Sequence, residues 1–344
     1  MPKDANYITM SRVLLGRGGQ FVVWIVYLFL FVTVMIAHIA GGGDILVQIF
    51  GDWIPHWAAK IVYVAVFMPL VYLGARTVDR FNLFLMAGLI ISYLLFVFVA
   101  LPHVDIKLLE RREWSKAWFA LPVLFTAFTF QVIIPTLMSY MERDIKKVRL
   151  AFFIGTSIPL FVYLVWQFLI LGIVLPEGPG SLQEAAQHGN NAVMPLKAIT
   201  KNPYLFGIGK AFAFFTLTAS YIALSLAFLD FLADGLKVSK TSAHKLWLCA
   251  LIFAPPTLIA LTYPHIFLTA LGYAGGFSCA ILFGLLPPVM TWVGRHVYHY
   301  HDDTRQLFGG KYFLTVLILF VVCELIIEIA DQFTASHVGL YLWP

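Results

Sequence analysis

Charged side chains are scarce in this sequence. Asp, Glu, Lys and Arg make up only 12% of the 344 residues, against about 25% in ordinary soluble domains. The mean hydropathy is +0.85, and 31 Phe, 15 Tyr and 9 Trp would be hard to bury in a water-soluble fold. This composition excludes an ordinary soluble domain and predicts an all-α polytopic membrane protein. Basic loops that face anionic lipid explain the net charge of +5 better than nucleic-acid binding does.

Motifs for chemistry are also missing. The three cysteines, Cys249, Cys279 and Cys323, lie in apolar runs without CxxC spacing, so neither a disulfide framework nor a zinc site is expected. The sequence contains no G-x-S-x-G, H-E-x-x-H, Walker or dinucleotide-binding motif. We interpret "GRGGQ" at 16–20 as a turn before the first helix. We therefore expect neither an enzyme nor a cofactor.

Long apolar runs recur along the whole chain, and each approaches the ~20 residues that a helix needs to cross a bilayer. The runs are mostly uninterrupted rather than alternating, which favours helices over the strands of a barrel. We expect a single transmembrane domain, residues 1–344, with nine spanning helices. They cover residues 21–40, 58–75, 81–101, 117–138, 150–175, 204–229, 246–262, 266–290 and 312–330.

The distribution of Lys and Arg predicts the orientation. With a cytoplasmic N-terminus, the inner loops receive most of the 23 basic residues, as the positive-inside rule requires. Nine crossings then place the C-terminus in the periplasm and the long loop 176–203 outside. Within that loop, "SLQEAAQ" at 181–187 predicts a short capped helix.

The fourth run carries polar residues where a spanning helix is normally apolar. The side chains near its middle are Thr126, Phe128, Thr129, Phe130 and Gln131. Pro135 removes a backbone donor and clashes with the preceding turn, so we predict that the helix opens around residues 129–131. Polar groups that join neighbouring helices would explain this pattern as well as a mid-membrane binding site would. In the second interpretation, the phenylalanines form apolar walls around a few polar anchors.

Ionisable residues inside membrane runs are candidates for ion coupling. The candidates in this sequence are His38, Asp44 and Glu324. Glu328 lies one turn after Glu324, so one of the two carboxyl groups is expected to be protonated, to reach the interface or to pair with another helix. Three histidines in "RHVYHYHDD", 295–303, fit a cytoplasmic loop, and we predict no metal site there.

Several segments resemble one family of transporters. They are "FTAFTFQVIIPTLMSYMERDIKKVRLAFFIGTSIPLFVYLVWQ" (125–167), "LSLAFLDFLADGL" (224–236), "FAPPTLIALTYPHIFLTALGYAGG" (253–276) and "LLGRGGQ" (14–20). They are similar, in the same order, to segments of the aromatic amino acid permeases, the bacterial tyrosine and tryptophan transporters. The resemblance runs from about residue 11 to residue 293. It implies a LeuT-like inverted-repeat fold and proton symport of an aromatic amino acid, tyrosine before tryptophan or phenylalanine, across the inner membrane.

The resemblance also implies site residues and a missing part. It places the substrate pocket on the fourth run, at the five residues named above. We expect residues of the first and sixth runs to complete it: Thr33, Ala37, Ser220 and Ser225. Because the first run here is similar to the family's third span, we expect the fold to be N-terminally incomplete, without two earlier spans. The alternatives to a transporter are a non-transporting fragment or membrane scaffold, and a membrane-embedded enzyme.

Overall fold

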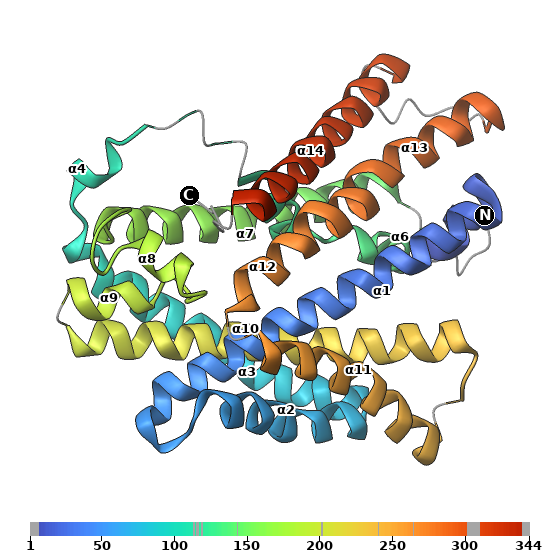
Figure 1. The fold of residues 1–344 in the computed structure, drawn as a ribbon. Helices are drawn as coiled ribbons and strands as arrows, with labels where there is room; N and C mark the ends of the chain where they lie inside the picture. Colours follow the sequence, from blue (N-terminus) through green and yellow to red (C-terminus); the bar gives the residue numbers. More distant parts are fainter. Residues whose placement is uncertain are drawn as a thin grey trace. The chain divides into compact units, whose positions relative to one another are not determined.

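The chain is built from helices joined by short connections (Figure 1). The computed structural model describes residues 7–112, 114, 117, 120–142, 144–200, 202–239, 241–263, 265–300 and 310–338. Within these ranges there is no strand, and eight helical segments are long and apolar enough to cross a membrane. A polytopic all-α protein, as predicted from composition, has this organisation.

Each of the eight segments corresponds to one predicted run. They are α1 (Tyr7–Phe50), α2 (His56–Leu73), α3 (Ala75–Ala100), α7 (Ile145–Ile173), α10 (Pro203–Leu236), α11 (Ser242–Thr262), the segment 266–297 and α14 (Gly310–Val338). The segment 266–297 contains α12 (Ile266–Tyr273), a π-helix (Ala274–Leu285) and α13 (Leu286–Trp292). The helix ends differ from those of the predicted runs, most at the two ends of α1 and at the end of α14.

The first helix needs a correction to the sequence analysis. We interpreted residues 16–20 as a turn that precedes it, but helical structure already begins at Tyr7, and the break is confined to Gly16, between a short helix before it and a long helix after it. Only Gly16 leaves the helical conformation, with φ 74° and ψ −167°, which kinks α1 at that point. A residue without a side chain adopts such a positive φ at little cost.

The fourth run is not one continuous helix. α5 covers Leu121–Ala127, a single 3₁₀ turn covers Gln131–Ile133, and α6 covers Ile134–Tyr140. The residues between α5 and the 3₁₀ turn are not helical, and this is where the sequence predicts an opening. Both pieces are too short to cross a membrane alone, so a ninth crossing here stays a prediction.

The described chain divides into two compact units. Unit 1 contains α1 as far as Leu30, α5, α6, α7 as far as Phe161, and the chain from Leu271 to the end of α14. Unit 2 contains α1 from Phe31, α2, α3, α4 (Ile106–Leu109), the rest of α7, α8 (Leu182–Gln187), α9 (Met194–Ile199), α10, α11, and α12 as far as Ala270.

In unit 2, α10 packs along α3, and α2 packs against α11 (Figure 1). α1 approaches α2 closely because it carries glycines where the helices meet. A Cβ atom added at Gly42 would overlap the ring of Tyr63, and one at Gly43 would overlap the Cγ atom of Lys60. Small residues permit such close approach of helices in membranes.

The loop before α10 contains the short helix predicted by "SLQEAAQ". α8 begins after Ser181, whose Oγ accepts a hydrogen bond from the backbone N–H of Glu184 at 3.2 Å. The side chain of Glu184 in turn accepts from the backbone N–H of Gly180. The predicted cap is therefore confirmed, with the reciprocal bond shifted by one residue.

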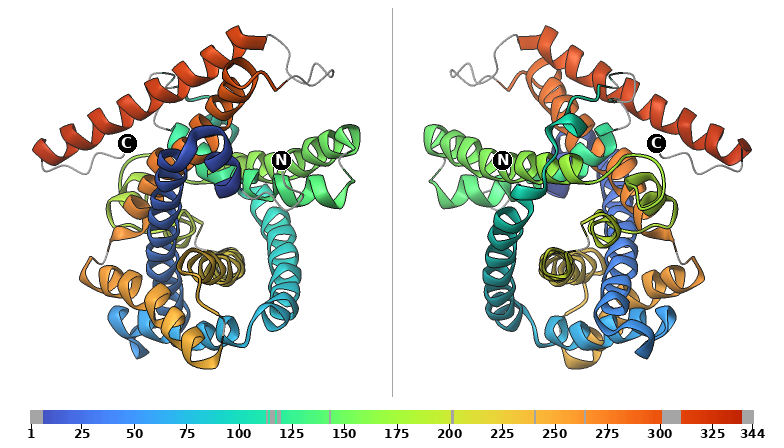
Figure 2. Two further views of the ribbon diagram at one scale, coloured as in Figure 1. Left: turned by 90° about the vertical axis from the view of Figure 1, so that its right-hand side faces the viewer. Right: turned by 90° about the vertical axis from the view of Figure 1, so that its left-hand side faces the viewer.

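In unit 1, α14 and α5 both pack against the π-helix (Figure 2). Its glycines make room for neighbouring side chains: an added Cβ would lie 2.7 Å from Cδ of Glu328 at Gly276, and 2.9 Å from the ring of Phe125 at Gly284. π-helical turns are rare and occur frequently at functional sites. Phe125 of α5, just before the opening, and the carboxyl group of Glu328 in α14 thus meet the same irregular segment.

Candidate functional site

The opening after α5 exposes backbone groups that a continuous helix would pair. Phe128 leaves the helical conformation at φ −110° and ψ 32°. Thr129 satisfies one freed group, since its Oγ1 donates to the carbonyl of Thr126 at 2.9 Å. The ring of Phe130 packs against Phe152 of α7, with 5.5 Å between the ring centroids. Two of the predicted site residues therefore stabilise the opening itself.

A cavity of about 250 Å³ lies beside the opening, within unit 1. Its lining is mostly apolar and includes Tyr7, Gln131, Ile134, Phe283, Met290 and Thr291. The side-chain oxygen of Gln131 is buried and has no hydrogen-bond partner among the described residues. The hydroxyl of Tyr7, in contrast, donates to the carbonyl of Leu282. An apolar pocket with one unused acceptor suits an aromatic ligand that carries a donor at its edge.

The site residues predicted on the first and sixth runs belong to unit 2. Thr33 and Ala37 are buried. The hydroxyl of Ser225 donates to the carbonyl of Tyr221 at 2.7 Å and lies 3.3 Å from the sulfur of Met35. Ser225 therefore takes part in the packing of α10 against α1.

His38 and Ser220 form a pair that the sequence analysis did not link. The Nε2 atom of His38 in α1 lies 2.9 Å from the Oγ atom of Ser220 in α10. The other ring nitrogen, Nδ1, donates to the carbonyl of Val34 at 2.7 Å. Both ring nitrogens of a buried histidine are thus engaged, one within its helix and one across to α10.

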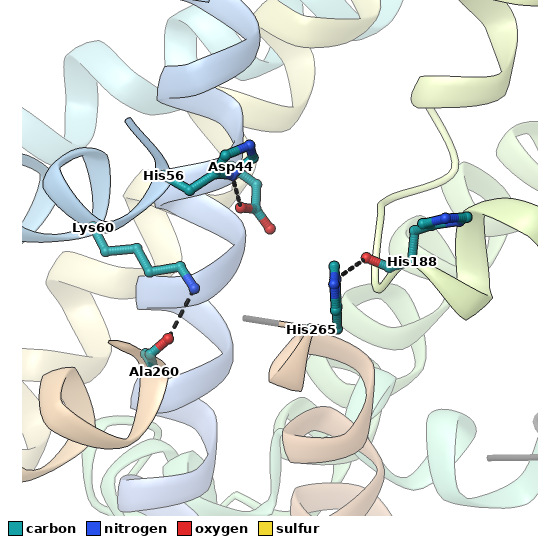
Figure 3. Close-up of polar contacts among 6 residues, drawn as sticks. All are labelled: Asp44, His56, Lys60, His188, Ala260 and His265. Carbon is teal, nitrogen blue, oxygen red and sulfur yellow. Dashed lines mark hydrogen bonds and ion pairs between the residues drawn. The ribbon is translucent and has the colours of Figure 1, made fainter. Parts of the chain in front are cut away.

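Asp44 lies beside two basic residues of α2 (Figure 3). Its Oδ1 is 3.4 Å from Nδ1 of His56. Lys60, one turn further along α2, is only 3% exposed, and its Nζ donates to the carbonyl of Ala260 at 2.8 Å. Because Ala260 lies in the last turn of α11, the cation also meets the negative end of that helix.

His265 completes this cluster from the turn before α12. Its Nδ1 lies 2.6 Å from the carbonyl of His188, which follows α8 (Figure 3). The carboxylate of Asp44 interacts electrostatically with Lys60, His56 and His265. Asp44 was a coupling candidate from the sequence, and the structure places it among three groups that carry or can acquire positive charge.

The third coupling candidate, Glu324, is 4% exposed in α14, and Glu328 one turn later is 7% exposed. Neither oxygen of Glu324 has a hydrogen-bond partner among the described residues. An ionised carboxylate without partners is costly in such surroundings. Of the three predicted loop histidines, His301 lies outside the described residues, and in the described chain no cluster of His, Cys, Asp and Glu could hold a metal ion.

Comparison with known proteins identifies the family. Residues 1–328 match the model of the Tryptophan/tyrosine permease family. The chain belongs to this family. The permease is 28% identical to the tyrosine-specific transport system 1 of Haemophilus influenzae, over 97% of its own length and 83% of the relative's.

Two further relatives of the permease are named for tryptophan. It is 25% identical to the tryptophan-specific transport protein of Haemophilus influenzae, over 95% of its own chain and 82% of the relative's. It is also 25% identical to the tryptophan-specific transport protein of Pseudomonas aeruginosa, with 95% and 80% coverage. The family and these relatives are transporters, so the chain is a permease and not an enzyme, which confirms the resemblance found in the sequence. The absence of two earlier spans stays a prediction.

Sequence reasoning missed Lys60, His56 and His265 in the permease. Of the three, Lys60 could have been recognised as a candidate functional residue, because it is an ionisable residue near the start of an apolar run. His56 and His265 had no such signal, since both lie at the ends of runs, where a histidine is unremarkable.

Proposed function

We propose that the permease imports an aromatic amino acid, tyrosine first, by proton symport across the bacterial inner membrane. The observation that supports this substrate class best is the cavity beside the opened helix, with the unpartnered oxygen of Gln131 in its wall. The relatives named for tyrosine and tryptophan transport support the same class.

The chemistry of the cavity favours tyrosine and tryptophan over phenylalanine. Apart from Gln131, most of its lining is apolar, as the ring of any aromatic amino acid requires. A phenol hydroxyl and an indole N–H are both donors, and the oxygen of Gln131 can accept from either. Phenylalanine offers no donor, and its binding would leave the buried oxygen without a partner.

Coupling to protons has support from the ionisable residues within the spans. His38, Asp44 and Glu324 all lie in segments that can cross a membrane, where such groups commonly form proton pathways. For the arrangement we propose the LeuT-like fold, with the opened fourth run at the substrate site and a cytoplasmic N-terminus. In that fold, interrupted helices bind the substrate near the middle of the bilayer.

Substitution of Gln131 by Leu tests the proposed site through the difference between two ligands. We expect the affinity of the purified permease for tyrosine to fall about 10- to 100-fold, the value of one or two buried hydrogen bonds. Affinity for phenylalanine should change little, because it makes no bond to this oxygen. Equilibrium binding of both ligands to each variant measures the difference.

The chain contains a matched control. The side-chain oxygen of Gln48 is also buried without a partner, but it lies in unit 2. Gln48→Leu therefore makes the same change away from the cavity and should leave binding of both ligands unaltered. Equal losses for tyrosine and phenylalanine in Gln131→Leu, or no loss for either, would place the substrate elsewhere.

A further inference from the structure

The pair formed by His38 and Ser220 has the properties of a proton-binding site. His38 is 9% exposed and lies within α1. Its Nδ1 is 2.7 Å from the carbonyl oxygen of Val34. A carbonyl oxygen only accepts hydrogen bonds, so Nδ1 carries a hydrogen whether the ring is neutral or charged. The proton that comes and goes is therefore the one on Nε2, which faces Ser220.

The hydroxyl of Ser220 can satisfy Nε2 in both states. Besides Nε2 at 2.9 Å, its Oγ lies 2.7 Å from the carbonyl oxygen of Thr216, one turn earlier in α10. When His38 is neutral, Ser220 donates its hydrogen to Nε2. When His38 is protonated, Nε2–H donates to Oγ, and the hydroxyl hydrogen turns to the carbonyl of Thr216. In each state both ring nitrogens of His38 and the hydroxyl of Ser220 take part in a hydrogen bond, and only the hydroxyl hydrogen has to rotate.

The surroundings of His38 leave its charge uncompensated. From α10, the ring of Tyr221 stacks on the imidazole, with 6.4 Å between the centroids. From α2, the ring of Tyr63 stands 5.0 Å from that of Tyr221. Among the described residues, the hydrogen bonds of His38 are to Val34 and Ser220 and its ring contact is with Tyr221, and none of these three is charged. The hydroxyl of Tyr221 is buried and has no hydrogen-bond partner among the described residues. A polar group able to form a further hydrogen bond therefore lies beside His38 and Ser220.

The other two coupling candidates, Asp44 and Glu324, do not have surroundings that accommodate both protonation states in this way. Asp44 is opposed in its ionised form by burial and favoured in it by Lys60, His56 and His265, so its protonation depends on three other groups. Glu324 has no partner for either oxygen, so one of its states is strongly disfavoured. His38 is the candidate that can gain and lose a proton while both of its ring nitrogens keep a hydrogen-bond partner.

We propose that Nε2 of His38 carries the coupling proton and that Ser220 is its positioning residue. This inference rests on the proton symport proposed above. The step is the binding of one proton to neutral imidazole from the side of higher proton activity and its release on the other side, with the hydroxyl of Ser220 reversing its direction each time. No other bond forms or breaks.

Transport assays in proteoliposomes separate coupling from substrate recognition. His38→Gln should retain exchange of labelled tyrosine for internal tyrosine, which needs no net proton movement, and should lose accumulation driven by an imposed pH gradient. Accumulation at the wild-type level in His38→Gln would overturn the proposal. Loss of exchange together with accumulation in a folded variant would also overturn it, because His38 would then serve substrate binding.

Ser220→Ala tests the positioning role through the pH profile. Without Ser220, the buried charged donor loses its acceptor, which costs more than the neutral ring losing its donor. The pH of half-maximal accumulation should therefore move down by about one unit, and Ser220→Thr, which keeps the hydroxyl, should restore it. Ser92→Ala is the control, because Ser92 lies in the same unit and its hydroxyl donates to the carbonyl of Leu89 in its own helix, away from His38. A profile that does not move in Ser220→Ala would contradict the role of Ser220.

A spectroscopic measurement tests, independently of transport, whether Nε2 of His38 binds and releases a proton. Nitrogen NMR of histidine-labelled permease in nanodiscs, with His38→Gln for assignment, reports the tautomer and the protonation of His38. The neutral ring should carry its hydrogen on Nδ1, and Nε2 should gain a proton as the pH falls. A neutral ring with its hydrogen on Nε2, or a ring that never titrates, would overturn the proton site. If tyrosine is not transported at all but His38 titrates as described, the proposed function fails and the proton site stands.

Discussion

The Nζ atom of Lys60 lies 2.8 Å from the carbonyl oxygen of Ala260, so a buried cation of α2 meets the C-terminal turn of α11. The same ammonium group interacts with the carboxylate of Asp44 in α1. One lysine therefore connects three helices of unit 2, at the point where Gly43 permits their close approach. This arrangement makes Lys60 a determinant of stability, whatever part it takes in transport.

Replacing Lys60 by Met should destabilise the permease by about 1–3 kcal/mol, because Asp44 and the carbonyl of Ala260 lose a charged partner. Asp44→Asn should also destabilise it. The double variant should lose less than the sum of the two, by roughly 0.5–3 kcal/mol, since it leaves neither charge uncompensated. Thermal unfolding of the four proteins in one detergent measures this coupling. Strictly additive losses would mean that Asp44 and Lys60 do not depend on each other.

The contact between Gly42 and Tyr63 gives a second prediction. A methyl group at position 42 would overlap the ring of Tyr63, which is fully buried. Gly42→Ala should therefore cost about 1–3 kcal/mol, as overpacking of a filled interior does. Gly207→Ala in α10 is the matched control, because open space surrounds that position, and helix propensity there favours Ala. Equal stability of the two variants would disprove the tight contact between α1 and α2.

Glu324 should respond to substitution in the opposite direction. Neither of its oxygens has a hydrogen-bond partner among the described residues, so its ionised form gains nothing from the fold. Glu324→Gln keeps the shape and removes the charge, and the melting temperature at neutral pH should stay constant or rise. A clear fall in melting temperature would show that the carboxylate has a charged or donating partner.

Asp144 caps α7 and gives a prediction for pH. The backbone N–H of Lys147 and that of Lys146 donate to its carboxylate, which holds the pKa of Asp144 below its ordinary value. The charged form is thus favoured by folding. The ionised carboxylate of Asp144 adds to the stability of the folded state. This stabilisation is complete above the ordinary carboxyl pKa and is lost as the pH falls through the lowered pKa of the folded state. Hydrogen exchange at the first turn of α7 should be faster in Asp144→Asn at neutral pH, and the two proteins should converge in acid. A difference that persists unchanged in acid would contradict this cap.

The spans could be predicted from the sequence because length and apolarity are local properties. The opening near residue 129 was predictable for the same reason, since Pro135 affects its own preceding turn. The length of α1 was not, because the polar N-terminal residues and Gly41–Gly43 lower the local apolarity that marks a span. Their helical conformation depends on packing partners such as Tyr63, which a reading of one segment does not include.

The polar pairs could not be predicted, because packing brings distant residues together. His38 and Ser220 are 182 positions apart, and Lys60 and Ala260 are 200 positions apart. Sequence reasoning identified His38, Asp44 and Ser220 individually, from residue type and position within a run. It could not tell that Ser220 faces a histidine, or that Asp44 faces a lysine.

The central claim is proton-driven transport of an aromatic amino acid, and uptake into proteoliposomes tests it most directly. Purified permease is reconstituted, an inward proton gradient is imposed, and accumulation of labelled tyrosine is followed with unlabelled tryptophan or a non-aromatic amino acid as competitor. The account predicts that tyrosine rises above its external concentration, that tryptophan competes, and that a proton ionophore abolishes the accumulation. Equilibration without accumulation under the gradient, or equal competition by non-aromatic amino acids, would contradict it.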